Sequence, residues 1–310
     1  QEPSRILTDS FKTGELGALI ELRDSIIPAY QDELDTMVYT LVEQVNRLHS
    51  GGSGLKAFQS LRSAVAVSAS TEPLVNAGLA FSAQAGTFTI EIVDSDRNVV
   101  ESYDITVDPT VDTLADIAAR IDAADGTVAG GSLQASVTAD NRLQIWTLGG
   151  QGFQFHGDDS GVLAALGVNT LFTGSTAEDI GINSIIDQDS DYLATSETGA
   201  VGDNGIILKI AQLRDERLMN GGTQTITEFY RATVGQIGIE GRRAEQMRNS
   251  SDLLLTALKD QRSSVSGVSI DEELINLVQA QQAFAAAARV VTMVDEMLDL
   301  VTSRLGTGGR

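Results

Sequence analysis

The stretch from Leu274 to Ala288 holds fifteen residues without a charged side chain, directly after a strong helix start. Ser269 is placed to cap this helix, and Asp271 to Glu273 supply the negative charge that a helix N-terminus favours. A helix on the surface of a monomer normally carries Lys and Glu on its outer side. This helix is therefore expected either in the core of its own domain or in contacts between chains.

Apolar residues recur along this helix at the three- and four-residue spacing of coiled coils. A second stripe runs beside the first, so two sides of the helix require partners. We predict an assembly interface with the following members: Leu274, Leu277, Gln281, Phe284, Ala288, Val291, Val294, Leu298 and Val301. An ordinary core helix has the same pattern and remains an alternative.

Charge and composition exclude several classes of protein. The 310 residues contain 21 Lys and Arg against 43 Asp and Glu, a net charge of −22, which disfavours nucleic acid and anionic membranes. No apolar run approaches the roughly 20 residues that span a bilayer. Cysteine is absent, so the fold is expected to be stable without disulfides. The first residue is not Met and no signal peptide is visible, which suggests a fragment or a processed chain.

The fold class that we predict is α+β and multi-domain, with long antiparallel α-helices in a coiled-coil-like bundle and an inserted β-rich domain. Four regions follow from the pattern: residues 1–60 as a first helical part, 61–175 as the inserted outer domain, 176–265 as a second helical part, and 266–310 as the C-terminal assembly helix.

The helical parts follow from a 3.6-residue period. Helices are expected over Glu15–His49, with a kink or restart at Pro28, over Asp203–Met219 and over Thr227–Gln261. Gly51–Gly54 is expected as a flexible break. Residues that repeat every seven positions suit a long antiparallel pair between the third helix and the final one; they are Ile237, Ala244, Ser251, Leu258 and Val265.

The insertion changes to a period of two. A hairpin is expected around the turn Asp94–Asn98, then a helix capped by Asp112 or Thr113, then a second hairpin with its turn at Ala139–Arg142. A short helix that ends at Gly167 follows. The expected order is therefore β-β-α-β-β in a small independent domain.

No catalytic, cofactor or metal site is predicted. His49 and His156 lie far apart in the chain without a nucleophile or a Cys, so structural or surface roles are expected for both. Asp94–Asn98 and Asp187–Asp191 begin like calcium loops but lack the closing glycine and glutamate, which favours Asx turns. The protein is therefore not expected to be an enzyme.

The C-terminal ninety residues resemble those of flagellar axial proteins, and most closely the FlgK family of hook-associated proteins. The resemblance is carried by the series Ser-Gly-Val, Asp-Glu-Glu and Gln-Gln-Ala-aromatic, at Ser266, Gly267, Val268, Asp271, Glu272, Glu273, Gln281, Gln282, Ala283 and Phe284. The helix from Gly14 and the Gly202–Asn204 motif are similar to the same family, which commonly has Tyr where Phe284 stands. Family members open with an N-terminal helix that is absent here, so the chain resembles a C-terminal portion.

The resemblance implies a structural subunit of the bacterial flagellum that forms the junction between hook and filament by self-assembly. It implies export through the flagellar type III secretion apparatus, an extracellular location, and four kinds of partner. These are other copies in a ring, the hook protein, the second hook-associated protein FlgL, and an export chaperone on the C-terminal helix. Alternatives are FlgL itself, a flagellin-like filament subunit or an acidic surface adhesin; a hydrolase lacks the residues it would require.

Overall fold

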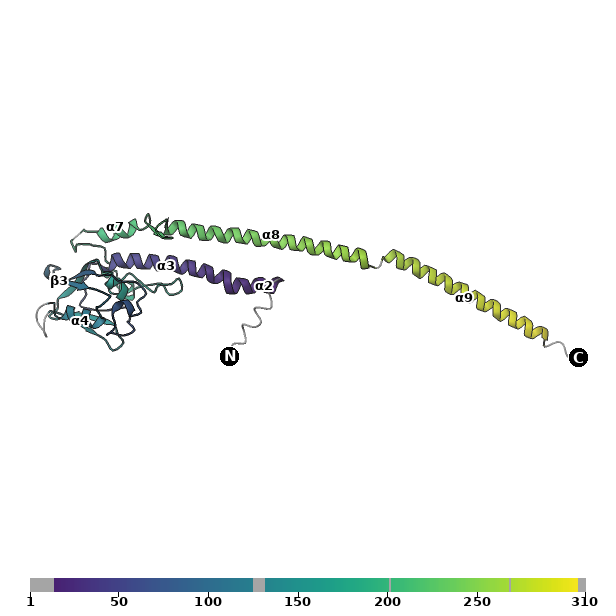
Figure 1. The fold of residues 1–310 in the computed structure, drawn as a ribbon, viewed down its shortest axis with the longest axis horizontal. Helices are drawn as coiled ribbons and strands as arrows, with labels where there is room; N and C mark the ends of the chain where they lie inside the picture. The colour runs from purple at the N-terminus through teal and green to yellow at the C-terminus, as the bar shows by residue number, and fades with distance from the viewer. Residues whose placement is uncertain (1–13, 125–131, 201, 268, 306–310) are drawn as a thin grey trace. The chain divides into compact units, whose positions relative to one another are not determined.

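The computed structural model describes residues 14–124, 132–200, 202–267 and 269–305 (Figure 1). The chain divides into two compact units, residues 1–236 and 237–310, which are described separately. The fold mixes helix and sheet and has a long C-terminal helix, in agreement with the α+β class predicted from the sequence.

The first unit begins with a nearly continuous helical rod, visible in Figure 1 as α2 and α3. Helix α2 covers Gly14–Glu21, a π-helical turn covers Leu22–Ile26, and α3 covers Ile27–Ser50 with Pro28 in its first turn. Because helix precedes Pro28, its missing N–H removes one helical hydrogen bond, and the π-helical turn lies directly before it. The predicted helix and its restart are therefore confirmed, and the restart is a π-helical turn rather than a gap.

A β-rich region follows α3. Its elements are β1 (Ser60–Arg62), a 3-10 turn (Leu74–Asn76), β2 (Gly86–Val93), β3 (Val99–Val107), α4 (Leu114–Asp122), β4 (Leu133–Val137), β5 (Leu143–Thr147), β6 (Gly152–Asp158) and α5 (Val162–Leu166). Both predicted hairpins are present, as β2–β3 and β4–β5. Thr113 caps α4 in a reciprocal capping box with Asp116, and Gly167 ends α5 in the left-handed conformation.

The strand order differs from the simple β-β-α-β-β expectation. Two three-stranded sheets form, in the orders β3-β2-β6 and β1-β5-β4, so each hairpin gains a strand from elsewhere in the chain. Strand β6 was not predicted, although Phe153 and Phe155 alternate with Gln154 and His156, because the alternating stretch is short and lies between glycines. Together the sheets and α4 enclose one core, whose largest fully buried members are Phe88, Phe153, Phe155, Ile90, Ile92, Ile105, Leu114, Ile117, Ile121, Leu133, Leu143 and Ile145.

The glycines after α3 are not the flexible break that the sequence suggested. Gly51 and Gly52 are buried. A methyl group on Gly51 would collide with the Asp158 backbone, and one on Gly52 would collide with the Ile206 side chain. A methyl group on Gly54 would lie 2.5 Å from the carbonyl oxygen of Asp191. The stretch is therefore a tightly packed joint, where glycine is needed for close approach of backbones.

Short elements complete this unit: β7 (Phe172–Thr173), β8 (Gly181–Ile182), α6 (Ser184–Gln188), a 3-10 turn (Ser190–Tyr192), α7 (Gly205–Gln212), β9 (Arg217–Met219) and β10 (Gln224–Thr225). The expected helix over Asp203–Met219 is wrong in its second half, because β9 pairs with β10. Positive φ angles at Asn220, Gly221 and Gly222 form the turn of this hairpin.

Helix α8 (Ile226–Ser266) starts in the first unit and continues into the second, which also holds α9 (Ile270–Leu305). At its start, the Thr233 hydroxyl donates a 2.6 Å hydrogen bond to Glu33 of α3. The helix predicted over Thr227–Gln261 and the predicted C-terminal helix are therefore both present. The antiparallel pairing predicted between them is not observed, because Leu254 and Leu258 of α8 and Leu274 of α9 are all more than half exposed.

Candidate functional site

The start of α9 is built as the sequence predicts. The Ser269 hydroxyl accepts a 3.4 Å hydrogen bond from the Glu272 N–H, and the Ser269 carbonyl accepts one of 3.0 Å from the Glu273 N–H. Three acidic residues occupy the first turn. This end of the helix therefore has a cap and favourable charge without help from another element.

All nine residues of the predicted assembly interface are exposed. The exposed fraction runs from 44% for Val294 to 78% for Phe284, and Gln281 and Ala288 are exposed as well. A buried Phe contributes roughly 1.5–3 kcal/mol relative to an exposed one, so Phe284 leaves that free energy unused in the single chain. The structure brings the nine residues onto one helix but does not give them a partner within the described residues.

Further apolar side chains lie outside the predicted interface. Ile275, Val278, Met293 and Leu300 are also exposed, between 42% and 57%. They were not predicted because they fall off the coiled-coil spacing, although the lack of charge around them was a usable signal. A helix that is apolar on all sides is normally buried all round. Helix α9 is therefore suited to contact more than one neighbouring element.

Helix α8 presents a second unpartnered surface. Ile237, Met247, Leu254, Leu258 and Val265 are exposed by 47% to 83%. At three glycines of this helix, no atom beyond the adjacent residues and the helix's own backbone lies within 4 Å of the position that a Cβ would occupy; they are Gly235, Gly238 and Gly241. This part of the helix is therefore open to close approach by another element.

His49 has a structural role. It is fully buried, its Nδ1–H donates to the Asn169 carbonyl at 2.8 Å, and its Nε2 accepts the Ala194 N–H at 2.9 Å. Burial lowers the pKa of His49 to about 4, so the ring is neutral near pH 7. The Asn169 side chain donates to the carbonyls of His49, Ser50 and Gly52, which closes the joint after α3.

His156 also lies in a network of protein groups. Its Nδ1 is 2.8 Å from the Glu197 carbonyl and its Nε2 is 2.7 Å from the Glu91 carboxylate. These contacts join β2 and β6 to the loop before α7. Both histidines thus hold segments together, as expected from the sequence.

The acidic loops form local turns. The Asp94 carboxylate accepts hydrogen bonds from the Asn98 side-chain amide and from the N–H groups of Asn98 and Asp96, and these bonds lower its pKa. Asp189 caps a 3-10 turn and pairs with Lys56 at 2.9 Å. The Asp203 carboxylate accepts hydrogen bonds from the Gly205 N–H, from the hydroxyl and N–H of Thr198 and from the Ser196 hydroxyl, so its pKa lies far below the usual range. Within the described ranges, no three His, Asp or Glu side chains are arranged to hold a metal ion.

Two family models match the ends of the chain. Residues 259–304 match "Flagellar basal body rod FlgEFG protein C-terminal", and residues 1–61 match "Flagellar hook-associated protein FlgK helical domain". The first match covers most of α9, and the second covers α2 and α3.

The chain is also similar to proteins named flagellar hook-associated protein 1. That of Bacillus subtilis (strain 168) is 37% identical over 129 residues, which are 41% of this chain and 25% of that protein. That of Salmonella typhimurium is 26% identical over 300 residues, which are 93% of this chain and 49% of that protein. The similarity to proteins of this name thus extends over most of the chain. It spans half or less of the length of these curated relatives.

The matches bear on the class of protein. They favour a structural flagellar protein over an enzyme, and the FlgK family over the FlgL-like, flagellin-like and adhesin alternatives. Among the described helices, none combines the length and the hydropathy that crossing a bilayer requires.

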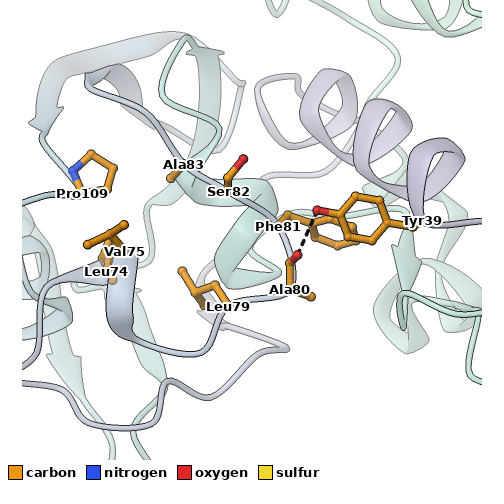
Figure 2. Close-up of a pocket in the computed structure, with 9 residues that line it drawn as sticks. All are labelled: Tyr39, Leu74, Val75, Leu79, Ala80, Phe81, Ser82, Ala83 and Pro109. Carbon is orange, nitrogen blue, oxygen red and sulfur yellow. Dashed lines mark hydrogen bonds between the residues drawn. The ribbon is translucent and has the colours of Figure 1, made fainter. Parts of the chain in front are cut away.

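A small pocket lies between α3 and the loop that precedes β2 (Figure 2). Its volume is about 200 Å³, and Leu74, Leu79 and Pro109 contribute to its apolar wall. Figure 2 shows the Tyr39 ring beside Phe81, with centroids 5.0 Å apart, and the Tyr39 hydroxyl donating to the Ala80 carbonyl. This contact fastens the β-rich region to α3. The residues that line the pocket include no carboxylate and no histidine.

Proposed function

We propose that the FlgK-like chain is a structural subunit of the bacterial flagellum that assembles at the junction between hook and filament. The observation that carries this proposal is α9, a helix with large apolar side chains on more than one side that are exposed along its length. The match of residues 259–304 to a rod-protein family and the relatives' name, hook-associated protein, support the location.

Assembly would proceed by coupled folding and burial. A helix in a protein gains most of its stability from packing and is only marginally stable alone, so α9 becomes fully ordered when a neighbour covers its apolar residues. The nine residues from Leu274 to Val301 form the interface in this proposal. Truncation of Phe284 to Ala would then cost the assembled state about 3–5 kcal/mol.

The proposal includes the partners and the place that the family resemblance implies. Copies of the chain form a ring, contact the hook protein on one side and FlgL on the other, and leave the cell by the flagellar export route with a chaperone on α9. Residues 61–175 form the outer domain, between helical parts at 1–60 and 176–265, and 266–310 form the assembly segment. The polar alternate positions of β3 support an outward-facing domain.

An addition assay tests this function. Isolated hooks without junction proteins are incubated with this chain, or with a version extended by the region of the Salmonella relative that it does not span. Electron microscopy then scores the distal ends. A new protein layer on the hooks is expected with the extended version. Absence of a layer with both versions would overturn the junction function.

Two variants of the extended version make the assay specific for α9. Phe284→Ala is expected to reduce the layer strongly, because it removes the largest apolar side chain of the interface. Val111→Ala is the matched control, since Val111 is 65% exposed in the β-rich region and lies outside α9. Equal loss of the layer with both variants would contradict assembly through α9.

A further inference from the structure

We propose that Asn220 is a site of spontaneous covalent modification, in which its side-chain amide is lost through attack by the Gly221 nitrogen. The product is an aspartate or an isoaspartate in the turn between β9 and β10. The sequence contains two Asn-Gly pairs, Asn204–Gly205 and Asn220–Gly221, and the structure places them in different environments. This inference does not depend on the proposed function, because it concerns the chemistry of one turn.

The reaction requires no enzyme and no oxidant. The main-chain nitrogen of the following residue loses its proton and bonds to the side-chain carbon Cγ of the asparagine. The Cγ–Nδ2 bond breaks and the amide nitrogen leaves as ammonia with that proton, so a five-membered succinimide ring remains. Water then opens the ring at Cγ, which gives aspartate, or at the main-chain carbonyl carbon, which gives isoaspartate. A following glycine favours ring closure because it has no side chain to obstruct the approach.

The Asn220–Gly221 pair has an unprotected attacking nitrogen. Asn220, Gly221 and Gly222 are all exposed. The Gly222 and Thr223 N–H groups both donate to the Met219 carbonyl at 3.1 Å, whereas the Gly221 N–H donates to none of the residues that the structure describes. No atom beyond the adjacent residues lies within 4 Å of the position that a Cβ on Gly221 would occupy. The nitrogen is therefore free, and the ring has room to form.

The conformation of the turn sets how often the ring can close. Asn220 has a φ angle of 49°, in the left-handed region. A left-handed residue holds its Cβ and the following nitrogen nearly trans about the Cα–C bond, so ring closure requires a brief opening of the turn. Asn220 is held there by two exposed hydrogen bonds, from its amide to the Gln224 side chain at 2.8 Å and from the Thr223 hydroxyl to its carbonyl at 3.0 Å. Opening of so exposed a turn costs little free energy.

The Asn204–Gly205 pair shows how the fold suppresses the same reaction. The Gly205 N–H donates a 2.9 Å hydrogen bond to the Asp203 carboxylate, whose negative charge also opposes loss of the proton. A Cβ on Gly205 would lie 3.0 Å from the Glu197 carboxylate, so the space beside the nitrogen is filled. The Asn204 carbonyl accepts the Leu208 N–H at the start of α7. Reaction at Asn204 would therefore require the start of this helix to open.

Two other asparagines share the left-handed backbone but not the glycine. Among the described residues, Asn141 and Asn169 also have positive φ angles, and Arg142 and Thr170 follow them. A side chain on the following residue obstructs the approach of its nitrogen to Cγ. The identity of its neighbour therefore distinguishes Asn220 from these asparagines.

The modification would alter the segment from which α8 starts. Strand β10 leads directly into α8, where the Glu228 side chain accepts the Thr225 N–H at 3.0 Å and the Thr225 hydroxyl accepts the Glu228 N–H at 3.1 Å. Aspartate keeps the length of the turn and tolerates the left-handed conformation. Isoaspartate adds one carbon to the main chain, which disturbs the pairing of Gln224 with Met219. Isoaspartate, rather than aspartate, is therefore expected to loosen the hairpin and the first turn of α8.

Peptide mapping by mass spectrometry tests the site. The 310-residue chain is incubated at mildly alkaline pH, and trypsin separates the two pairs because Lys209, Arg214 and Arg217 lie between them. Exchange of ammonia for water marks a deamidated peptide, and electron-transfer fragmentation distinguishes isoaspartate from aspartate. In the folded chain Asn220 is expected to react at least about tenfold faster than Asn204, because less structure must open.

The denatured chain is the control, because both asparagines then precede a glycine in an open chain. The ratio of the two rates is expected to fall to within about threefold. Equal rates in the folded chain, or a faster rate at Asn204, would overturn the proposal. A tenfold ratio that persists in denaturant would overturn it as well, since local sequence rather than the fold would then set the difference.

Hydrogen exchange tests the consequence for α8. Asn220→Asp is expected to keep the protection of β9, β10 and the first turn of α8 within about threefold of the parent, whereas chain enriched in isoaspartate at this position is expected to lose about tenfold. Asn204→Asp is the matched control, because it makes the same charge change at an exposed position outside the hairpin. Equal losses for Asn220→Asp and for isoaspartate would show that charge rather than main-chain length matters, and would overturn the effect on α8.

Discussion

Two phenylalanines illustrate how burial differs between the β-rich region and the long C-terminal helices. Phe155 in β6 is fully buried among side chains of its own chain, whereas Phe284 in α9 is 78% exposed. Both lie in segments that are poor in charge, and both would stabilise a core if covered. The comparison teaches that apolar content alone does not distinguish a segment that folds by itself from one that is completed by a partner.

Charge separates the same two regions. Residues 1–236 contain 13 Lys and Arg against 33 Asp and Glu, a net charge of −20, whereas residues 237–310 contain 8 against 10, a net charge of −2. Copies of the first unit therefore repel one another, while the second unit is close to neutral. Close packing between copies is consequently less costly through the helices of the second unit than through the first.

Truncation of the two phenylalanines gives the largest expected contrast. Phe155→Ala is expected to lower the free energy of unfolding by about 3–5 kcal/mol, because it leaves a cavity among fully buried neighbours. Phe284→Ala is expected to change it by less than about 0.5 kcal/mol at concentrations where the chain is monomeric. Urea unfolding followed by Trp146 fluorescence measures both. A loss of similar size for both variants would show that α9 packs on the first unit.

The sequence predicted the parts of each region that depend on local signals. The hairpin β2–β3, the cap at Thr113 and the start of α9 at Ser269 all follow from residues within a few positions of one another. The pairing of β6 with β2 joins residues about 60 positions apart, and no local pattern specifies it.

The same limit applies to the candidate site. The spacing of Leu274, Leu277 and Phe284 predicted a stripe, and the structure places these residues on one exposed helix. Which surface covers the stripe depends on another molecule or another segment, so neither the spacing nor the single chain specifies it. Gly51–Gly54 is the opposite case, because its composition suggested flexibility and tertiary packing made it a rigid joint.

The pH dependence of stability is expected to come from the first unit through His49. Its pKa is about 4 in the fold against 6.5 for the free side chain, so the unfolded chain binds a proton first as the pH falls. Stability is therefore full above about pH 6.5 and is lost progressively down to about pH 4. The difference corresponds to about 3 kcal/mol, at 1.36 kcal/mol for each pKa unit.

Asp158 opposes part of this effect. Burial raises its pKa, so its contribution to stability increases as the pH falls through that pKa. Urea unfolding at pH 7, 6, 5 and 4.5 measures the sum, and His49→Gln serves as the variant without the titrating ring. The variant is expected to be less stable at pH 7 but to lose less stability on acidification. An identical slope in parent and variant would refute the role of His49.

Glycine-to-alanine substitutions are the smallest test and should have opposite signs in the two regions. Gly54→Ala is expected to destabilise the first unit by about 1–3 kcal/mol, because the new methyl group meets the Asp191 backbone. Gly238→Ala is expected to stabilise α8 by up to about 1 kcal/mol, because Ala favours a helix and nothing lies within 4 Å. Thermal unfolding followed by circular dichroism at 222 nm measures both. If Gly238→Ala stabilises the monomer yet weakens self-association, the glycine allows another helix to approach closely. If the substitution leaves self-association unchanged, no such contact offsets the helix stability that the glycine costs α8.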